Sequence, residues 1–147
     1  MKFVIVYASI HHQNTKKIVD DLCECFPVDS IDLTQDPYPD ISSYDRIGLA
    51  SGIYFGSVHP LIKDFVEKTK FRKDQKCFVI TTAGAPFLDF SGFLCRTLKK
   101  KGIECCGSFH CRGYDTYAIF GKIGGIAKGR PDTKDIMRAR KFLDSLK

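Results

Sequence analysis

Hydroxyl, amide and imidazole side chains gather in one short segment near the N-terminus, between an apolar run and a segment of helical period. Backbone N–H groups at the start of a helix have no partner within it, and the helix dipole is positive there, so an anion is favoured. Helix capping by Asn14 or Thr15 is the plainer interpretation, but a cap alone does not need so long a polar loop. We therefore expect a phosphate group to bind in this first loop. Its residues are Ser9, Ile10, His11, His12, Gln13, Asn14 and Thr15.

Two adjacent aromatic residues with glycines on either side follow a second apolar run. Tyr54 and Phe55 could stack on a planar ligand, and glycine lets a backbone approach closely or change its conformation. The alternative, that both rings simply cover the end of a sheet, stays open from this loop alone. Candidate binding residues in this second loop are Ser51, Gly52, Ile53, Tyr54, Phe55 and Gly56.

A third loop, of small and hydroxylated residues, follows another apolar run at residues 77–82. Such residues offer backbone donors and acceptors with little steric bulk. The signal is weak by itself and gains weight only if the three loops lie together. Its candidate binding residues are Thr82, Ala83, Gly84, Ala85 and Phe87.

Alternating strands and helices are expected to position these loops. Apolar residues recur at helical spacing between the apolar runs, and strands that alternate with helices form a doubly wound α/β sheet. We predict a single domain over residues 1–147, with five parallel strands in the order 2-1-3-4-5. Ligands of such a sheet bind beyond the carboxyl ends of the strands, where the winding reverses. The predicted strands span residues 2–8, 28–33, 46–52, 77–82 and 105–111.

At this point the chain resembles the flavodoxins. The first loop and its helix are similar to the family's FMN phosphate-binding segment, and residues 51–56 and 82–87 match the loops on the two sides of the flavin ring. The closing stretch, residues 113–131, resembles a subgroup of short prokaryotic flavodoxin-like proteins. Two departures stand out. Gln13 occupies a position where that subgroup tends to have glycine, and Ser57 and His59 stand in a ring loop where ordinary flavodoxins carry acidic residues.

The resemblance implies electron transfer through bound FMN, with redox partner proteins. It places the backbone of Phe55 and Gly56 near the flavin N5, and it requires no catalytic acid or base, so we assign none. One alternative is a flavin-dependent oxidoreductase of the quinone or protoporphyrinogen type on the same fold. Another is a non-enzymatic binding module of flavodoxin-like fold. The sequence does not separate these functions.

Composition and cysteine count narrow the class of protein. The chain has 147 residues, of which 44% are hydrophobic and 27% charged, as in a folded domain. No apolar run approaches the roughly 18 residues that a membrane span needs. Seven cysteines, an odd number that falls mostly in apolar runs, indicate free thiols in a reducing, cytoplasmic compartment. No metal-binding spacing occurs among them, so we expect no structural metal.

The charge is unevenly distributed along the chain. Residues 1–59 carry 4 Lys or Arg and 8 Asp or Glu, a balance of −4, whereas residues 60–147 carry 19 and 9, a balance of +10. A solvated basic face is the plainer interpretation, and an acidic redox partner is the functional one. We expect no nucleic-acid partner, and the sequence does not indicate an oligomeric state.

Two further motifs suggest other chemistry. Cys106 and Arg112 have the Cys-x5-Arg spacing of phosphatases that form a cysteinyl-phosphate, but the segment is expected to be the fifth strand rather than a phosphate loop. His11 and His12 could bind a metal, although adjacent residues rarely bind the same ion. We expect them to lie near the phosphate instead.

Overall fold

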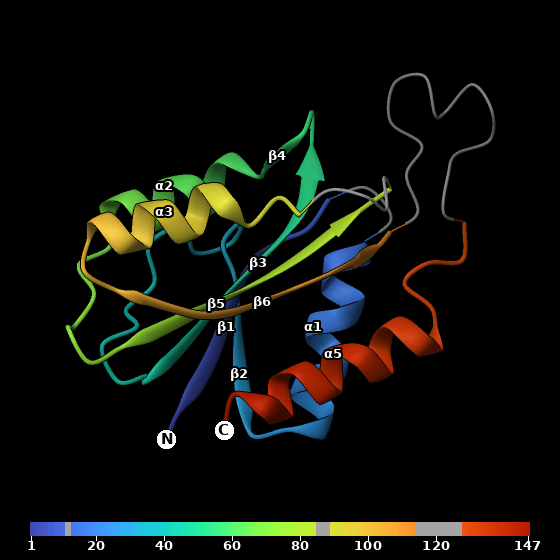
Figure 1. Ribbon diagram of the computed structural model, residues 1–147, viewed down its shortest axis with the longest axis horizontal. Helices are drawn as coiled ribbons and strands as arrows, with labels where there is room; N and C mark the ends of the chain where they lie inside the picture. The colour runs from blue at the N-terminus through green and yellow to red at the C-terminus, as the bar shows by residue number, and fades with distance from the viewer. Residues whose placement is uncertain (11–12, 85–88, 114–127) are drawn as a thin grey trace.

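Five parallel strands form the centre of the molecule. The computed structural model describes residues 1–10, 13–84, 89–113 and 128–147, and Figure 1 shows their path. The strands are β1 (Phe3–Ala8), β2 (Val28–Asp32), β3 (Arg46–Tyr54), β5 (Lys76–Ala83) and β6 (Glu104–Arg112). They lie in the order β2-β1-β3-β5-β6, and each neighbouring pair is parallel. This confirms the predicted doubly wound sheet and its strand order.

A short antiparallel strand, β4 (Ser57–Val58), corrects the prediction of a plain loop after residue 52. It pairs with the end of β3, which therefore extends to Tyr54. Phe55 and Gly56 connect the two strands and have φ angles of 52° and 73°. Positive φ at both central residues marks a type I′ turn, whose twist suits a two-residue hairpin. The aromatic pair is consequently carried beyond the main sheet.

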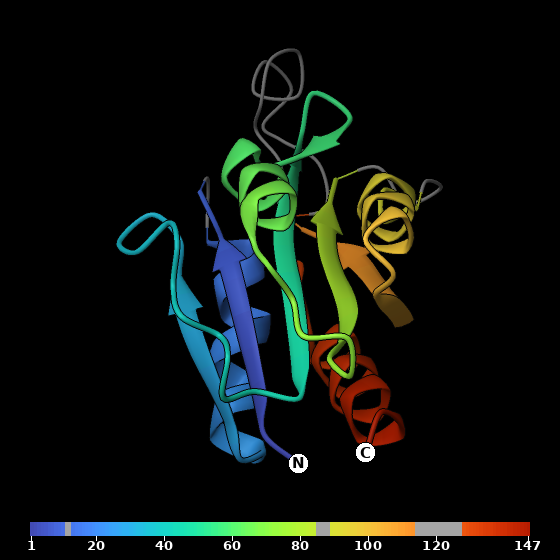
Figure 2. The same cartoon turned by 90° about the vertical axis from the view of Figure 1, so that its left-hand side faces the viewer.

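Within the described residues, two helices cover each face of the sheet (Figures 1 and 2). Helices α1 (Asn14–Cys25) and α5 (Thr133–Ser145) pack together on one face. Helices α2 (Pro60–Lys68) and α3 (Gly92–Lys100) pack together on the other. None of the described helices is long and apolar enough to cross a membrane.

Strand β1 illustrates why the sheet needs both layers. All six of its residues are buried, because successive side chains of a strand point to opposite faces. Phe3, Ile5 and Tyr7 belong to the core beneath α1 and α5. The even-numbered residues belong to the core beneath α2 and α3. A strand covered on both faces is apolar throughout, which is the pattern seen in the sequence.

The carboxyl ends of the strands meet at one edge of the sheet, called the loop edge below. Ala8 of β1 pairs with Ser51 of β3. Gly52 in turn pairs with Thr82 of β5, and β6 ends beside them. The loops that follow β1, β3 and β5 therefore begin side by side. In Figure 2 this edge lies at the top, opposite the two termini.

Candidate functional site

The first loop enters α1 through a residue in the left-handed conformation. Gln13 is the N-cap, with φ 53° and ψ 37°, and makes no side-chain capping hydrogen bond. The plainer interpretation, capping by Asn14 or Thr15, is therefore wrong. Ser9 Oγ instead accepts a hydrogen bond from the N–H of Lys16 at 3.2 Å, which ties the end of β1 to the first helical turn. The predicted residues His11 and His12 lie outside the described part of the chain.

A buried hydrogen bond joins the first loop to the third. The hydroxyl oxygens of Thr15 and Thr82 are 2.9 Å apart, and both residues are almost completely shielded from water. The start of α1 is therefore fixed to the end of β5. Strand β5 ends at Ala83, one residue beyond the predicted strand, and Gly84 follows it. The other two predicted residues of this loop, Ala85 and Phe87, lie outside the described residues.

The Tyr54 side chain joins the second loop to the first. Its hydroxyl accepts a hydrogen bond from the Ile10 N–H at 3.0 Å and donates one to the Ile10 carbonyl at 3.2 Å. Its ring lies so close to Gly52 that a Cβ there would be 2.6 Å from the Tyr54 hydroxyl oxygen. Burial raises the pKa of Tyr54, so the hydroxyl keeps the proton that it donates.

The two adjacent aromatic residues of the second loop have different environments. Tyr54 is half-buried, whereas Phe55 is 82% exposed at the tip of the β3–β4 hairpin. Gly56 beside it has open space around the position of a Cβ. The two rings therefore differ in exposure, and stacking of Tyr54 or Phe55 on a planar ligand stays a prediction.

The remaining predicted residues of the second loop support the backbone. Ser51 is fully buried, and its hydroxyl accepts a hydrogen bond from the His59 N–H at 2.9 Å. Ile53 pairs with Val58 in the hairpin and packs against the core beneath α2 and α3. Both residues therefore stabilise the backbone of the second loop.

His59 is the N-cap residue of α2 and was not among the predicted site residues. Its Nδ1 accepts a hydrogen bond from the Leu61 N–H at 3.0 Å, which caps the helix. Its ring meets that of Tyr54 edge-on, with the centroids 5.6 Å apart. Burial lowers the pKa of His59, which agrees with the neutral form that the Nδ1 acceptor requires.

The end of β6 completes the loop edge with two residues that sequence reasoning missed. Gly113 donates a backbone hydrogen bond to the Ala83 carbonyl at 3.0 Å. A Cβ at Gly113 would be 2.6 Å from Asn14 Nδ2, so only glycine admits the Asn14 side chain here without displacement. Arg112 donates from Nε to the Gly84 carbonyl at 3.2 Å. The predicted strand order could have identified both residues, because it places the end of the fifth strand beside the third loop.

The phosphatase interpretation of Cys106 and Arg112 is excluded by the geometry. Both residues lie within β6, and six residues of extended strand separate them by roughly 20 Å. A cysteinyl-phosphate site needs both groups around one phosphate. Burial also raises the pKa of the Cys106 thiol, which disfavours the nucleophilic thiolate.

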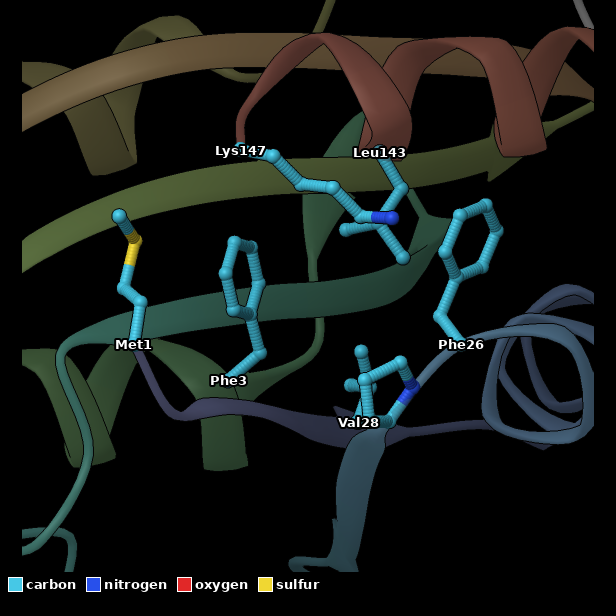
Figure 3. Close-up of a pocket in the computed structure, with 7 residues that line it drawn as sticks. Met1, Phe3, Phe26, Val28, Leu143 and Lys147 are labelled. Atoms are coloured by element: carbon cyan, nitrogen blue, oxygen red, sulfur yellow. The ribbon is translucent and has the colours of Figure 1, made fainter.

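A separate pocket of about 240 Å³ lies at the opposite end of the strands (Figure 3). Its walls are mainly apolar and come from the start of β1, the end of α1 and the end of α5. The lining residues are Met1, Phe3, Phe26, Pro27, Val28, Leu143 and Lys147. The Lys147 ammonium lies 4.8 Å from the centroid of the Phe26 ring. This pocket shares no residue with the loop edge.

Comparison with known sequences identifies a family model and a curated relative that are similar to this chain. A family model described as a flavodoxin domain matches residues 4–86, which is more than half of the chain. An uncharacterized protein of Methanocaldococcus jannaschii is 41% identical over 148 residues. That match covers 99% of this chain and 98% of the relative.

Solved structures share the fold at much lower identity. General stress protein 14 of Treponema denticola, in complex with FMN, is 14% identical with a TM-score of 0.69, over 100% of both chains. The FMN-bound flavodoxin of Fusobacterium nucleatum is 12% identical with a TM-score of 0.65, over 99% of this chain and 97% of that one. The Trp repressor binding protein of Bacillus subtilis is 15% identical with a TM-score of 0.69, over 95% and 97%.

Proposed function

The chain belongs to the flavodoxin-domain family, and from this premise we propose that it binds FMN at the loop edge and carries electrons through it. One structural observation supports the proposal most strongly. Tyr54 and Ile10 join the first and second loops, while Thr15 and Thr82 join the first and third. Three loops far apart in sequence therefore form one connected surface at the switch point of the sheet, where such folds bind ligands.

The first loop fits the phosphate group of FMN. The Ser9 hydroxyl can donate to the phosphate while its oxygen accepts from the Lys16 N–H, and the N-terminus of α1 adds the positive end of the helix dipole. A helix N-terminus favours a dianionic phosphate. Lys16 and Lys17 in the first helical turns add positive charge, although Lys16 is also paired with Asp20 at 2.6 Å.

The second and third loops fit a planar ring. Phe55 presents an exposed aromatic face at the hairpin tip, and Gly56 leaves room beside it. Thr82, Ala83 and Gly84 have small side chains or none, so a ring could approach their backbone closely. We propose that Phe55 rather than Tyr54 covers the ring, because the Tyr54 hydroxyl is already committed to Ile10.

Bound FMN would supply the redox chemistry, and the protein would set its binding and electrostatic surroundings. The contacts of this edge suit that limited task. Tyr54 and His59 are neutral and make structural hydrogen bonds, so neither is poised to move a proton to a substrate. We therefore propose an electron carrier in preference to an enzyme that converts a bound substrate.

The positive charge of the C-terminal part of the chain would match an acidic redox partner protein. Helices α2 and α3 both begin there, and Lys63 of α2 lies with its ammonium 5.0 Å from the centroid of the Phe93 ring of α3. Residues 60–147 carry a balance of +10. Opposite charges speed encounter, and salt screens them. We propose such a partner, for which the rate of electron transfer should fall between low and physiological salt; a rate independent of salt would contradict it.

The test of FMN binding is a titration of the purified, flavin-free protein. FMN fluorescence should be quenched to saturation at one FMN per chain, and the bound flavin should be reduced and reoxidised reversibly. FAD should bind more weakly, because the first loop lacks the Gly-x-Gly-x-x-Gly segment of dinucleotide sites. Failure of FMN to bind at concentrations that saturate another flavodoxin would overturn the proposal.

A further inference from the structure

The position of Tyr54 assigns it a task that differs from ring stacking. Its hydroxyl contacts both the N–H and the carbonyl of a single residue, Ile10, at 3.0 and 3.2 Å. One side-chain group thus holds the two peptide units on either side of the Ile10 Cα. Ile10 lies two residues beyond the end of β1, where the chain leaves the sheet and would otherwise be free to vary.

Two features of the second loop, at Gly52 and His59, hold the Tyr54 ring in place. Residues two apart on a strand point to the same face, so Gly52 lies beside Tyr54 on β3. Because Gly52 has no Cβ, the ring can lie back along the strand toward the first loop; a Cβ there would be 2.9 Å from the ring carbon Cζ. His59 supports the ring edge-on. The hydroxyl therefore reaches Ile10 from a side chain that is itself restrained.

We propose that Tyr54 is a positioning residue that fixes the first loop for phosphate binding from the neighbouring loop, and that it contributes little to binding of the flavin ring. This inference rests on the proposed function. The inference assigns the two ends of FMN to different residues. Binding of the phosphate depends on the Tyr54 hydroxyl, and binding of the ring depends on Phe55 and the third loop.

The experiment removes only the hydroxyl, with Tyr54→Phe, and compares FMN with riboflavin, which has the same ring without the phosphate. A phenylalanine keeps an aromatic ring at this position, so a stacking role would survive the change. We expect FMN affinity to fall about tenfold, which corresponds to about one hydrogen bond of net stabilisation. Riboflavin affinity should remain unchanged.

Tyr44→Phe is the matched control. The Tyr44 hydroxyl donates to Asp29 at 2.7 Å near the amino ends of the strands, away from the loop edge. The same chemical change there should leave the affinities for FMN and riboflavin as in the wild type. A loss of FMN affinity in both variants would attribute the effect to general destabilisation and would overturn the assignment to Tyr54.

Amide hydrogen exchange of the flavin-free protein provides a readout that does not depend on ligand binding. In Tyr54→Phe the Ile10 amide and its neighbours in the first loop should exchange faster, while amides within β3 should not. Unchanged exchange at Ile10, or equal losses of FMN and riboflavin affinity, would overturn the positioning role. Failure of the wild type to bind FMN would instead contradict the proposed function, and the exchange result would still decide whether Tyr54 holds the loop.

Discussion

At the scale of single residues, the loop edge depends on hydroxyl groups whose partners come from another loop. Thr15 and Thr82 are the clearest pair, because both are buried and each hydroxyl contacts the other at 2.9 Å. The sequence alone did not indicate this hydrogen bond, because the two residues are 67 positions apart. Only the predicted strand order places their loops near each other. A buried polar group that loses its partner costs more free energy than the hydrogen bond itself contributes.

Replacing Thr15 with valine should therefore lower the free energy of unfolding by about 1–3 kcal/mol, because Thr82 keeps a buried hydroxyl. The double variant Thr15→Val, Thr82→Val should recover much of that loss, because no unpaired hydroxyl remains. Urea unfolding of the four proteins in this cycle measures the effect. Losses that simply add would show that the two hydroxyls do not interact.

His59 gives the loop edge a defined dependence on pH. Burial lowers its pKa below the usual 6.5, and protonation would abolish the Nδ1 acceptor that caps α2. Because the folded-state pKa is the lower one, the unfolded chain takes up the proton first as pH falls. The stabilisation is thus complete above about pH 6.5 and decreases as pH falls through the folded-state pKa.

His59→Asn should reduce this pH dependence, because asparagine also caps helices and does not titrate. Urea unfolding at pH 7.5 and pH 5 should show a larger loss of stability on acidification for the wild type than for the variant. Equal losses in the two proteins would mean that other groups, such as carboxylates, account for all of the acid sensitivity.

At the scale of elements, the β3–β4 hairpin carries the candidate ring contact. Its two-residue turn needs positive φ at Phe55 and Gly56. Glycine adopts this conformation without steric cost, whereas a residue with a Cβ adopts it at a cost of roughly 1–2 kcal/mol. The hairpin therefore depends on Gly56, although among the described residues no atom other than those of its chain neighbours lies within 4 Å of where its Cβ would be.

Gly56→Val should lower the free energy of unfolding by roughly 1–2 kcal/mol and also shift the midpoint potential of bound FMN, since the turn lies against the proposed ring site. Gly102→Val is the control. Gly102 also has positive φ (75°) and open space around the Cβ position, but it follows α3 away from the loop edge. It should lose similar stability and leave the potential unchanged. Equal potentials in both variants would exclude this turn from redox tuning.

Most elements could be predicted because apolar periodicity reports burial directly. A strand that is covered on both faces and a helix with one buried stripe give different patterns of apolar residues in the sequence. These patterns predicted the sheet and its switch point. Strand β4 was not predicted because two residues are too few to show a periodic pattern. The difference in exposure between Tyr54 and Phe55 was not predicted because it depends on the hairpin turn. The contact between Gly113 and Asn14 depends on strand packing that no local pattern records.

At the scale of the whole molecule, the distribution of charge sets the expected midpoint potential of bound FMN. Reduction of bound FMN adds negative charge, which nearby carboxylates disfavour. The proposed ring loop carries Ser57 and His59 and no carboxylate among residues 51–59. Two unit charges about 8 Å apart interact by roughly 2 kcal/mol at an effective dielectric constant near 20. The midpoint potential of bound FMN should therefore be higher than in a flavodoxin with an acidic ring loop.

Ser57→Asp tests this effect of charge on the midpoint potential within one protein, because it introduces a carboxylate into the proposed ring loop. It should lower the midpoint potential of bound FMN, by an energy on the order of 2 kcal/mol or less. Ser43→Asp adds the same charge near the amino end of β3, beyond several screening lengths in physiological salt. It should not shift the potential. Identical potentials for the wild type and Ser57→Asp would show that the ring-loop charge does not control reduction.

The location of FMN is the central claim, and NMR chemical-shift mapping tests it most directly. FMN added to the isotopically labelled protein should shift amide resonances of the first loop, the hairpin tip at Phe55 and Gly56, and the third loop at Thr82 and Gly84. Resonances around the apolar pocket that Phe26 and Lys147 line should stay in place. Shifts confined to that pocket, with the loop edge unchanged, would contradict the account.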